Sequence, residues 1–324
     1  MAGSTWSDIL QLIAQQRQKG DPNAFDTVRR HYLNQLHQLT ERDTILYSTA
    51  WTQNQGGSPG LSITNEDVHG FMEAVHGLEG PELDLILHSP GGSAEATEQI
   101  VAYLRAKFSE IRIFVPQSAM SAATLMCCAA DEVVMGNHSS LGPIDPQIGI
   151  QTQTGVRTTA AQAILDQFEM AKSEISTNTD LLAWLPILRQ YAPGLVAECE
   201  EAKELSIDLA EEWATQYMHG GDPDAEQKAR QLAEYLANRR EFKSHSRRIS
   251  REQAAENGFN VTALEDDQDL QDLVLAVFHA TSHTHNGTPL VKLIENHTGR
   301  AFMKSLGSDA PEQEEKPAPE KEEE

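Results

Sequence analysis

Short apolar runs alternate with longer amphipathic stretches between residues 44 and 135. Strands are predicted where the apolar runs fall, at residues 44–50, 83–88, 111–115 and 132–135. Helices are predicted where the periodic stretches fall, at residues 64–77, 93–107 and 121–130. Because strands and helices alternate, this region predicts a parallel sheet with right-handed crossovers.

Both flanks of this region have mainly helical spacing. Residues 5–41 predict one or two amphipathic helices that break near Gly20-Asp21-Pro22. Further helices are predicted at residues 161–175, 181–191, 195–219, 224–238, 268–279 and 291–296, with one short strand at 261–264. The fold class is therefore α/β. We divide the chain into an N-terminal helical segment (1–43), an α/β core (44–160), a helical C-terminal region (161–307) that completes the fold, and an acidic tail (308–324).

The charge and the cysteines restrict the class of protein. A net charge of -24 argues against nucleic acid and anionic membranes as partners. Residues 309–324 hold eight acids against two lysines, which is typical of a disordered solubilising tail. Three cysteines form no disulfide framework and favour a reducing, cytoplasmic location. Since no apolar run reaches roughly 18 residues and no basic leader precedes one, we expect neither a membrane span nor a signal peptide.

Two predicted strand ends carry the candidate chemistry. The first strand ends in Pro90-Gly91-Gly92, and the second leads into small residues around Ser121. Parallel strands bring such ends to one edge of the sheet, where open α/β sheets bind ligands. There the glycine turn and the Ala122 N–H could stabilise an oxyanion while Ser121 attacks a carbonyl. The structural alternatives are a plain strand-to-helix turn and a buried serine.

Three segments in this order carry a resemblance, namely LDLILHSPGGSAEATEQIVAYLR, IRIFVPQSAMSAATLMCCAADEVVMG and NHSSLGPIDPQIG. They resemble the Clp protease and signal peptide peptidase A superfamily, and most of all its serine dehydrogenase proteinases. The resemblance implies a ClpP/crotonase-like spiral core and a ring-like homo-oligomer that acts on peptides or proteins without a cofactor. It also implies that Ser121 is the nucleophile and that Gly91 and Gly92 form the oxyanion hole.

The general base is where the sequence departs from this resemblance. Clp proteases place a histidine before a Gln-Pro pair, whereas residues 142–147 read GPIDPQ. The peptidase A branch uses a downstream lysine, and Lys172 lies 51 residues after Ser121. A buried lysine with a lowered pKa can act as a base, so the Ser121–Lys172 dyad is the leading prediction. His245 and His138 are alternative bases.

Other polar residues near these segments are assigned structural roles. Lys203 is a weaker candidate base because its acidic neighbours indicate a solvated helix face. Asp145 could orient a base, but the turn before Pro146 is the favoured interpretation. His88 is expected to pack at a strand end. The histidines at 279, 283 and 285 lack a fourth donor for zinc, and no metal site is predicted.

We therefore predict a soluble serine peptidase that forms an acyl-enzyme on Ser121. One alternative is a catalytically silent scaffold or binding protein of the same fold. Another is a crotonase-type acyl-CoA enzyme that uses the glycine turn without a serine nucleophile. No Walker-type phosphate loop occurs in the sequence, so any dependence on ATP would require a separate ATPase partner.

Overall fold

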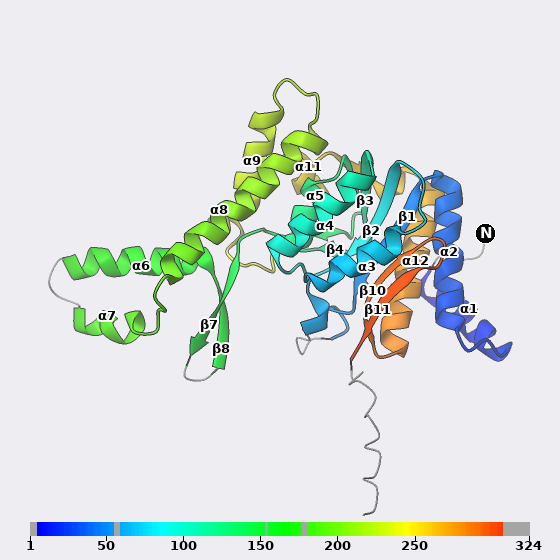
Figure 1. Cartoon of the computed structure of the whole chain (residues 1–324), viewed down its shortest axis with the longest axis horizontal. Helices are drawn as coiled ribbons and strands as arrows, with labels where there is room; N and C mark the ends of the chain where they lie inside the picture. The colour runs from blue at the N-terminus through cyan, green and yellow to red at the C-terminus, as the bar shows by residue number, and fades with distance from the viewer. Residues whose placement is uncertain (1–4, 55–58, 153–154, 177–180, 307–324) are drawn as a thin grey trace, which may run out of the picture.

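A seven-stranded sheet forms the centre of the molecule (Figure 1). The computed structural model describes residues 5–54, 59–152, 155–176 and 181–306. The strand order is β11-β10-β1-β2-β3-β5-β9. Their bounds are β1 Asp43–Thr49, β2 Glu82–His88, β3 Glu110–Val115, β5 Glu132–Met135, β9 Val261–Ala263, β10 Leu290–Asn296 and β11 Ala301–Ser305. Strands β1, β2, β3, β5 and β9 run parallel, and β10 is antiparallel to β1 and β11, so the α/β prediction with a mostly parallel sheet is confirmed.

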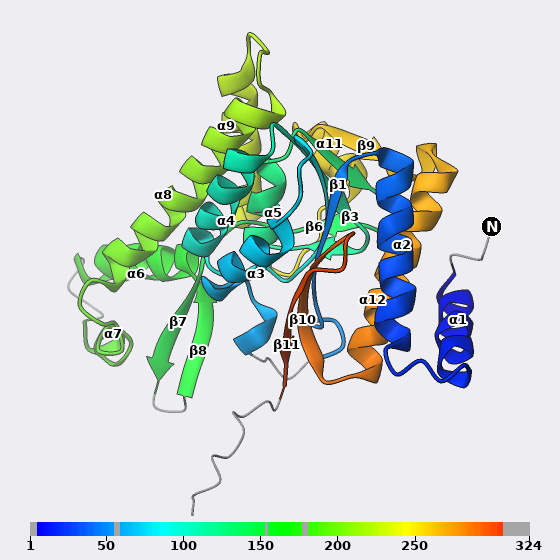
Figure 2. The same cartoon turned by 45° about the vertical axis from the view of Figure 1, so that its right-hand side comes forward.

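Helices cover both faces of this sheet (Figures 1 and 2). One face packs against α1 (Trp6–Gln18), α2 (Ala24–Thr40) and α12 (Gln268–Gly287). The other packs against α3 (Glu66–Val75), α4 (Ala94–Lys107), α5 (Ala122–Cys128), α8 (Leu195–Trp213) and α9 (Ala225–Ala237). Side chains alternate along each strand: Leu85 and Leu87 join the second cluster, whereas Ile86 joins the first.

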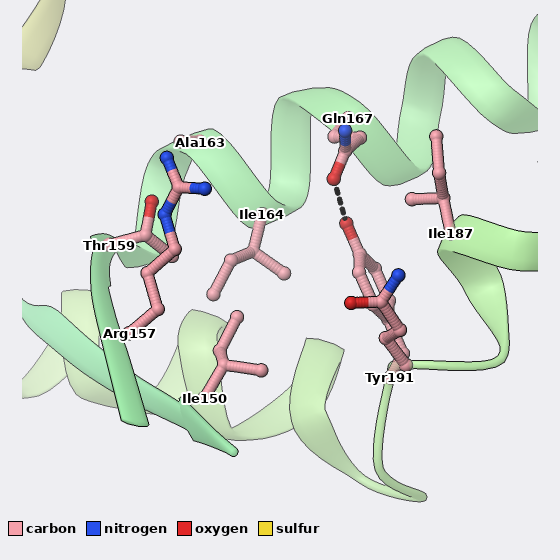
Figure 3. A pocket seen from close by; sticks show the side chains of 9 residues that line it. Ile150, Arg157, Thr159, Ala163, Ile164, Gln167, Ile187 and Tyr191 are labelled. Carbon is pink, nitrogen blue, oxygen red and sulfur yellow. Dashed lines mark hydrogen bonds between the residues drawn. The ribbon is translucent and has the colours of Figure 1, made fainter. Parts of the chain in front are cut away.

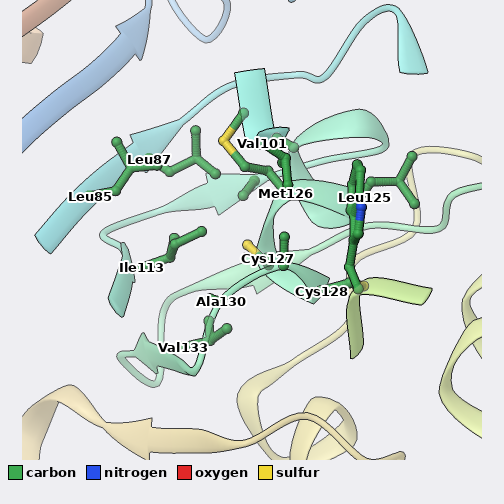
Figure 4. Packing of buried hydrophobic residues seen from close by; sticks show 14 of the residues in the cluster. Leu85, Leu87, Val101, Ile113, Leu125, Met126, Cys127, Cys128, Ala130 and Val133 are labelled. Carbon is green, nitrogen blue, oxygen red and sulfur yellow. The ribbon is translucent and has the colours of Figure 1, made fainter. Parts of the chain in front are cut away.

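Helix α5 lies wholly in the core. Figure 4 shows its Met126 and Cys127 side chains among those of Leu85, Ile113 and Val133. Burial raises the pKa of Cys127 well above its usual value and that of Cys128 to about 12. Thiols that stay protonated behave as small apolar side chains, so Cys127 and Cys128 pack in the core as such.

An arm projects from the core (Figures 1 and 2). It consists of the antiparallel hairpin β7 (Gln147–Thr152) and β8 (Gly155–Ala160), followed by α6 (Ala161–Ser176) and α7 (Leu181–Leu188). Shorter elements complete the chain: η1 Pro59–Leu61, β4 Ser118–Ala119, β6 Ser140–Leu141, η2 Ala214–Met218, α10 Arg239–Phe242, α11 Arg251–Glu256 and η3 Leu264–Asp266. Across the described ranges, every helix is too short or too polar to cross a membrane.

The C-terminal region departs from the prediction. The helix expected at 291–296 is wrong, because these residues form β10, which pairs with β1 in the middle of the sheet. Strand β11 and the β7–β8 hairpin were not predicted, and α12 continues past residue 279 to Gly287. The region 161–307 therefore adds three strands to the sheet of the region 44–160. The four-segment division stays a prediction, and its tail, 308–324, lies outside the described residues.

Candidate active site

The structure brings the two candidate strand ends together. Strands β2 and β3 are parallel, and beyond them Ser89 pairs with the short β4. The Ser89 N–H donates to the Ser118 carbonyl at 3.1 Å, and the Met120 N–H donates to the Ser89 carbonyl at 3.0 Å. The Gly91-Gly92 turn therefore lies directly beside Ser121.

Ser121 has an unusual backbone conformation, with φ 54° and ψ -121°. A non-glycine residue rarely adopts a positive φ, which costs on the order of 1–3 kcal/mol, and such strained residues cluster at active sites. The residue stands between β4 and α5, and its side chain makes no capping hydrogen bond to the helix. A sharp strand-to-helix turn of this kind exposes a serine hydroxyl for attack.

The two glycines differ in what they contribute. Gly91 has φ +89°, and a Cβ there would lie 2.4 Å from the Met120 oxygen and 2.7 Å from the Ala122 nitrogen. Its N–H donates to Ser89 Oγ at 3.2 Å, so Gly91 supplies close approach to the Ser121 segment rather than a free donor. A Cβ on Gly92 would lie 2.3 Å from the Ile63 oxygen, so a neighbouring segment presses against this glycine too.

The turn and the start of α5 each present one backbone N–H that has no acceptor among the described residues. The Ile63 N–H donates to the Gly91 carbonyl at 2.8 Å, and the Ser93 N–H donates to the Ile63 carbonyl at 3.0 Å. Gly92 lies between Gly91 and Ser93, opposite Ile63. Neither the N–H nor the carbonyl of Gly92 takes part in these two hydrogen bonds. Among the described residues, neither the Gly92 N–H nor the Ala122 N–H at the start of α5 has an acceptor.

These groups open onto a cavity of about 430 Å³. Ser121, Gly92 and Ala122 line one side of it. Its apolar lining comes from Leu125, Ile144, Ile148 and Leu205. His245, from the loop between α10 and α11, lines the same cavity.

His245 is paired with a buried carboxylate. Its Nδ1 lies 2.7 Å from Asp145 Oδ1, and Asp145 is only 4% exposed. Because Nδ1 faces an acceptor, the neutral ring carries its proton there and has a basic Nε2. Two backbone hydrogen bonds between Ile249 and Leu141, of 2.9 and 3.0 Å, fasten the histidine loop to the loop of Asp145.

Lys172, the leading base predicted from the sequence, lies elsewhere. It stands on α6 in the projecting arm and does not line the cavity of Ser121. Its side chain is 59% exposed, and Nζ is paired with Glu169 Oε1 at 2.7 Å, one turn away on the same helix. An ammonium that lies outside the cavity and is paired with a carboxylate of its own helix is not placed to take a proton from Ser121, so the geometry does not favour a Ser121–Lys172 dyad.

The other candidate residues, His138, His88 and Lys203, do not line the cavity of Ser121. His138 is exposed in the turn after β5 and does not line the cavity. His88 packs against the rings of Phe278 and Trp51, and burial lowers its pKa to about 3. Lys203 Nζ donates to Gln162 Oε1 at 2.8 Å and lines a different cavity from Ser121.

His283 and His285 of α12 make contacts within the fold. His283 Nε2 lies 3.0 Å from the Trp6 carbonyl, and His285 contacts Ser48 Oγ and the Leu290 carbonyl. Sequence reasoning did not single out another group, His37, Asp43 and His297, whose ligand atoms lie within 4.8 Å of one another. Its rings are stacked at 3.7 Å, and His297 Nδ1 accepts the Thr44 N–H at 3.2 Å. These contacts join α2 to the sheet.

A second cavity, of about 320 Å³, lies in the arm (Figure 3). It is enclosed by the β7–β8 hairpin, α6 and α7, and the Tyr191 hydroxyl donates to Gln167 Oε1 at 2.6 Å across it. Its lining offers Arg157 but neither a serine nor a histidine. The chemistry-bearing residues are therefore concentrated in the cavity of Ser121.

Known proteins of similar sequence match about a quarter of the chain. Two uncharacterized proteins of Methanocaldococcus jannaschii are 42% and 41% identical to this chain over 88 residues. These matches cover 27% of this chain and 31% and 30% of the relatives, so the chain spans less than a third of their length.

The solved structures are more distant. Two mutant forms of 1510-N, a membrane-bound stomatin-specific protease, align over 65% of this chain and 79% and 74% of theirs. Their sequence identities are 14% and 16%, with TM-scores of 0.40 and 0.39, and the second is in complex with a substrate peptide. The family model of the ClpP-like SDH-type serine proteinases matches residues 61–185, which include Gly91, Gly92 and Ser121. This part of the chain, which holds the Gly91-Gly92 turn and Ser121, is therefore similar to the ClpP-like SDH-type serine proteinases.

Proposed function

We propose that the protein is a serine peptidase in which Ser121 is the nucleophile, His245 the general base and Asp145 the residue that orients His245. One observation carries the proposal: His245, which Asp145 holds, lines the same cavity as Ser121, Gly92 and Ala122, and the last two have N–H groups without an acceptor among the described residues. A serine, a histidine and a buried carboxylate in these roles form a catalytic triad whatever their order in the sequence.

The reaction proceeds in two halves. Ser121 Oγ attacks the carbonyl carbon of a peptide bond while His245 Nε2 accepts the hydroxyl proton. The Gly92 and Ala122 N–H groups then donate to the oxyanion of the tetrahedral intermediate. As the C–N bond breaks, His245 returns the proton to the leaving amine, and an acyl-enzyme remains on Ser121. Water, activated by the same histidine, hydrolyses this ester.

Asp145 keeps the imidazole in the productive tautomer. Its carboxylate accepts from His245 Nδ1 at 2.7 Å and from Gln147 Nε2 at 2.9 Å. These bonds fix the ring and stabilise the imidazolium that forms when Ser121 loses its proton. The apolar wall of the cavity favours an uncharged side chain of the substrate beside the scissile bond.

The substrate, the oligomeric state, the partners and the location of the protein are predictions from the sequence. A peptide or protein substrate follows from the proposed reaction. A homo-oligomer, a separate ATPase partner and a cytoplasmic location are further predictions, the last supported by three buried free cysteines.

A fluorophosphonate probe tests the proposed function. The probe forms a covalent adduct with an activated serine, and mass spectrometry of tryptic peptides locates it. We expect one adduct, on Ser121, absent from Ser121→Ala, together with hydrolysis of unfolded casein that is lost in the same variant. A well-folded wild-type protein that is neither labelled nor hydrolytic would instead indicate a silent scaffold or an acyl-CoA enzyme.

A further inference from the structure

A buried lysine is hydrogen-bonded to the segment that pairs with the Gly91-Gly92 turn, which we call the oxyanion turn, and the proposed reaction does not use this lysine. Lys292 stands on β10, and its side chain is 1% exposed. Nζ donates to both carboxylate oxygens of Asp67, at 2.6 and 2.8 Å, and Asp67 is also 1% exposed. Burying two charges costs free energy that their mutual attraction often does not repay. A buried ion pair therefore calls for an explanation other than stability.

The pair holds a short segment of chain at both of its ends. Lys292 Nζ donates to the Ser62 carbonyl at 2.8 Å, and the Thr64 N–H donates to Asp67 Oδ2 at 3.1 Å. Ile63, between these two residues, makes the backbone hydrogen bonds to Gly91 and Ser93. The ion pair therefore fixes the segment whose backbone is hydrogen-bonded to Gly91 and Ser93.

A second route connects the pair to the same turn. Tyr47 Oη donates to Asp67 Oδ2 at 2.8 Å, and the nearby Ser89 hydroxyl opposes the rise that burial causes in the pKa of Tyr47. Ser89 Oγ in turn accepts the Gly91 N–H at 3.2 Å. Tyr47 and Lys292 thus both donate to the Asp67 carboxylate, and Ser89, beside Tyr47, receives the Gly91 N–H.

We infer that the Lys292–Asp67 pair is a positioning device that holds Ile63 and Ser89 against the glycine turn, so that the Gly92 N–H faces the oxyanion. This inference rests on the proposed function of Gly92. Neither Lys292 nor Asp67 lines the cavity, so both act through the turn and not on the substrate.

The same strand supplies a matched control. Glu295 of β10 forms a second ion pair, with Arg29, at 2.6 Å and with both side chains 0% exposed. Leu293 and Glu295 face α2 and α12, whereas Lys292 and Ile294 face the opposite side of the sheet. Arg29→Met thus removes an equally buried ion pair that does not touch the Gly91-Gly92 turn, while Glu295 keeps its contact with Arg30 Nε at 2.5 Å.

Steady-state peptide hydrolysis distinguishes positioning from stability. In Lys292→Met we expect kcat to fall by at least about tenfold with KM changed less than about twofold, because a misplaced donor weakens transition-state binding alone. Arg29→Met should lower Tm and leave kcat unchanged. If Lys292→Met does not fold, Tyr47→Phe removes a single hydroxyl of the network and should lower kcat by a smaller factor. Equal kcat values for Lys292→Met, Tyr47→Phe and wild type would overturn the inference.

Hydrogen exchange provides a readout that does not depend on catalysis. Amides of residues 62–64 and 89–93 should exchange faster in Lys292→Met or Tyr47→Phe than in wild type, and at the wild-type rate in Arg29→Met. If wild type shows no Ser121-dependent hydrolysis but this pattern appears, the proposed function fails and the positioning role stands. Unchanged exchange in both network variants would contradict the positioning role itself.

Discussion

The substitution Gly91→Ala tests how closely the glycine turn must approach the nucleophile. A methyl group at this position would lie 2.4 Å from the Met120 oxygen, 2.7 Å from the Ala122 nitrogen and 2.8 Å from Ser121 Cβ. These atoms belong to the backbone and to Ser121 itself, so no flexible side chain can move aside. The turn and the serine segment must separate.

The structure sets the size of the effect. Relief of a 2.4 Å contact to an ordinary separation of about 3.4 Å requires a displacement of about 1 Å, and errors of that size cost about 100-fold in rate. Alanine at φ +89° adds about 1–2 kcal/mol of backbone strain, and overpacking adds about 1–3 kcal/mol. We therefore expect fluorophosphonate labelling to slow about 100-fold and the free energy of unfolding to fall by about 2–5 kcal/mol.

Gly77→Ala is the matched control. Gly77 has φ +82°, but an added Cβ would meet no atom within 4 Å, and the residue precedes β2 at the other end of the strand. It should show the backbone strain alone, about 1–2 kcal/mol in urea unfolding, and label at the wild-type rate. Wild-type labelling of Gly91→Ala would refute the reasoning, because the turn could then not lie against Ser121 as described.

Three further predictions concern the base, a buried histidine and a helix cap. Asp145→Asn should lower kcat of peptide hydrolysis by about 10³–10⁴ with little change in KM, since the amide favours the wrong tautomer of His245; an unchanged kcat would remove Asp145 from the mechanism. Burial lowers the pKa of His88 to about 3, so the unfolded chain takes up a proton below pH 6.5 that the folded protein does not. Stability should therefore fall by about 1.4 kcal/mol per pH unit from this group as pH drops from 6.5 toward 3, and His88→Phe should flatten the pH dependence of urea unfolding by that amount. Ser93 Oγ accepts the Ala96 N–H at 3.0 Å at the start of α4, so Ser93→Ala should cost about 1 kcal/mol in the same assay, whereas no loss would mean that the cap is not formed in solution.

The sequence predicted the parallel core well because that information is local. The apolar runs that became β2, β3 and β5 each end at a glycine, proline or other turn residue, and Ser93 begins α4 as an N-cap. Strand β10 was misread as a helix because six residues of mixed apolar and charged character fit either period. Its charges are buried on both faces, which only their distant partners Asp67 and Arg29 explain.

The nucleophile with its oxyanion donors and the base with its carboxylate also differ in how far local sequence predicts them. Ser121 and the glycines could be read from adjacent strand ends, whereas His245 lies 100 residues after its partner Asp145. The segment around His245 is basic, which is typical of a surface loop, and no local pattern indicates that it folds over the cavity. The positive φ of Ser121 also has no sequence signal, since neighbouring small residues permit this conformation but do not require it.

The identity of the general base is the most direct test of this account. The rate of fluorophosphonate labelling at Ser121 should be measured for wild type, His245→Ala and Lys172→Ala, with folding verified by circular dichroism. We predict that His245→Ala labels at least about 100-fold more slowly and that Lys172→Ala labels at the wild-type rate. Slow labelling of Lys172→Ala together with rapid labelling of His245→Ala would contradict the proposed triad.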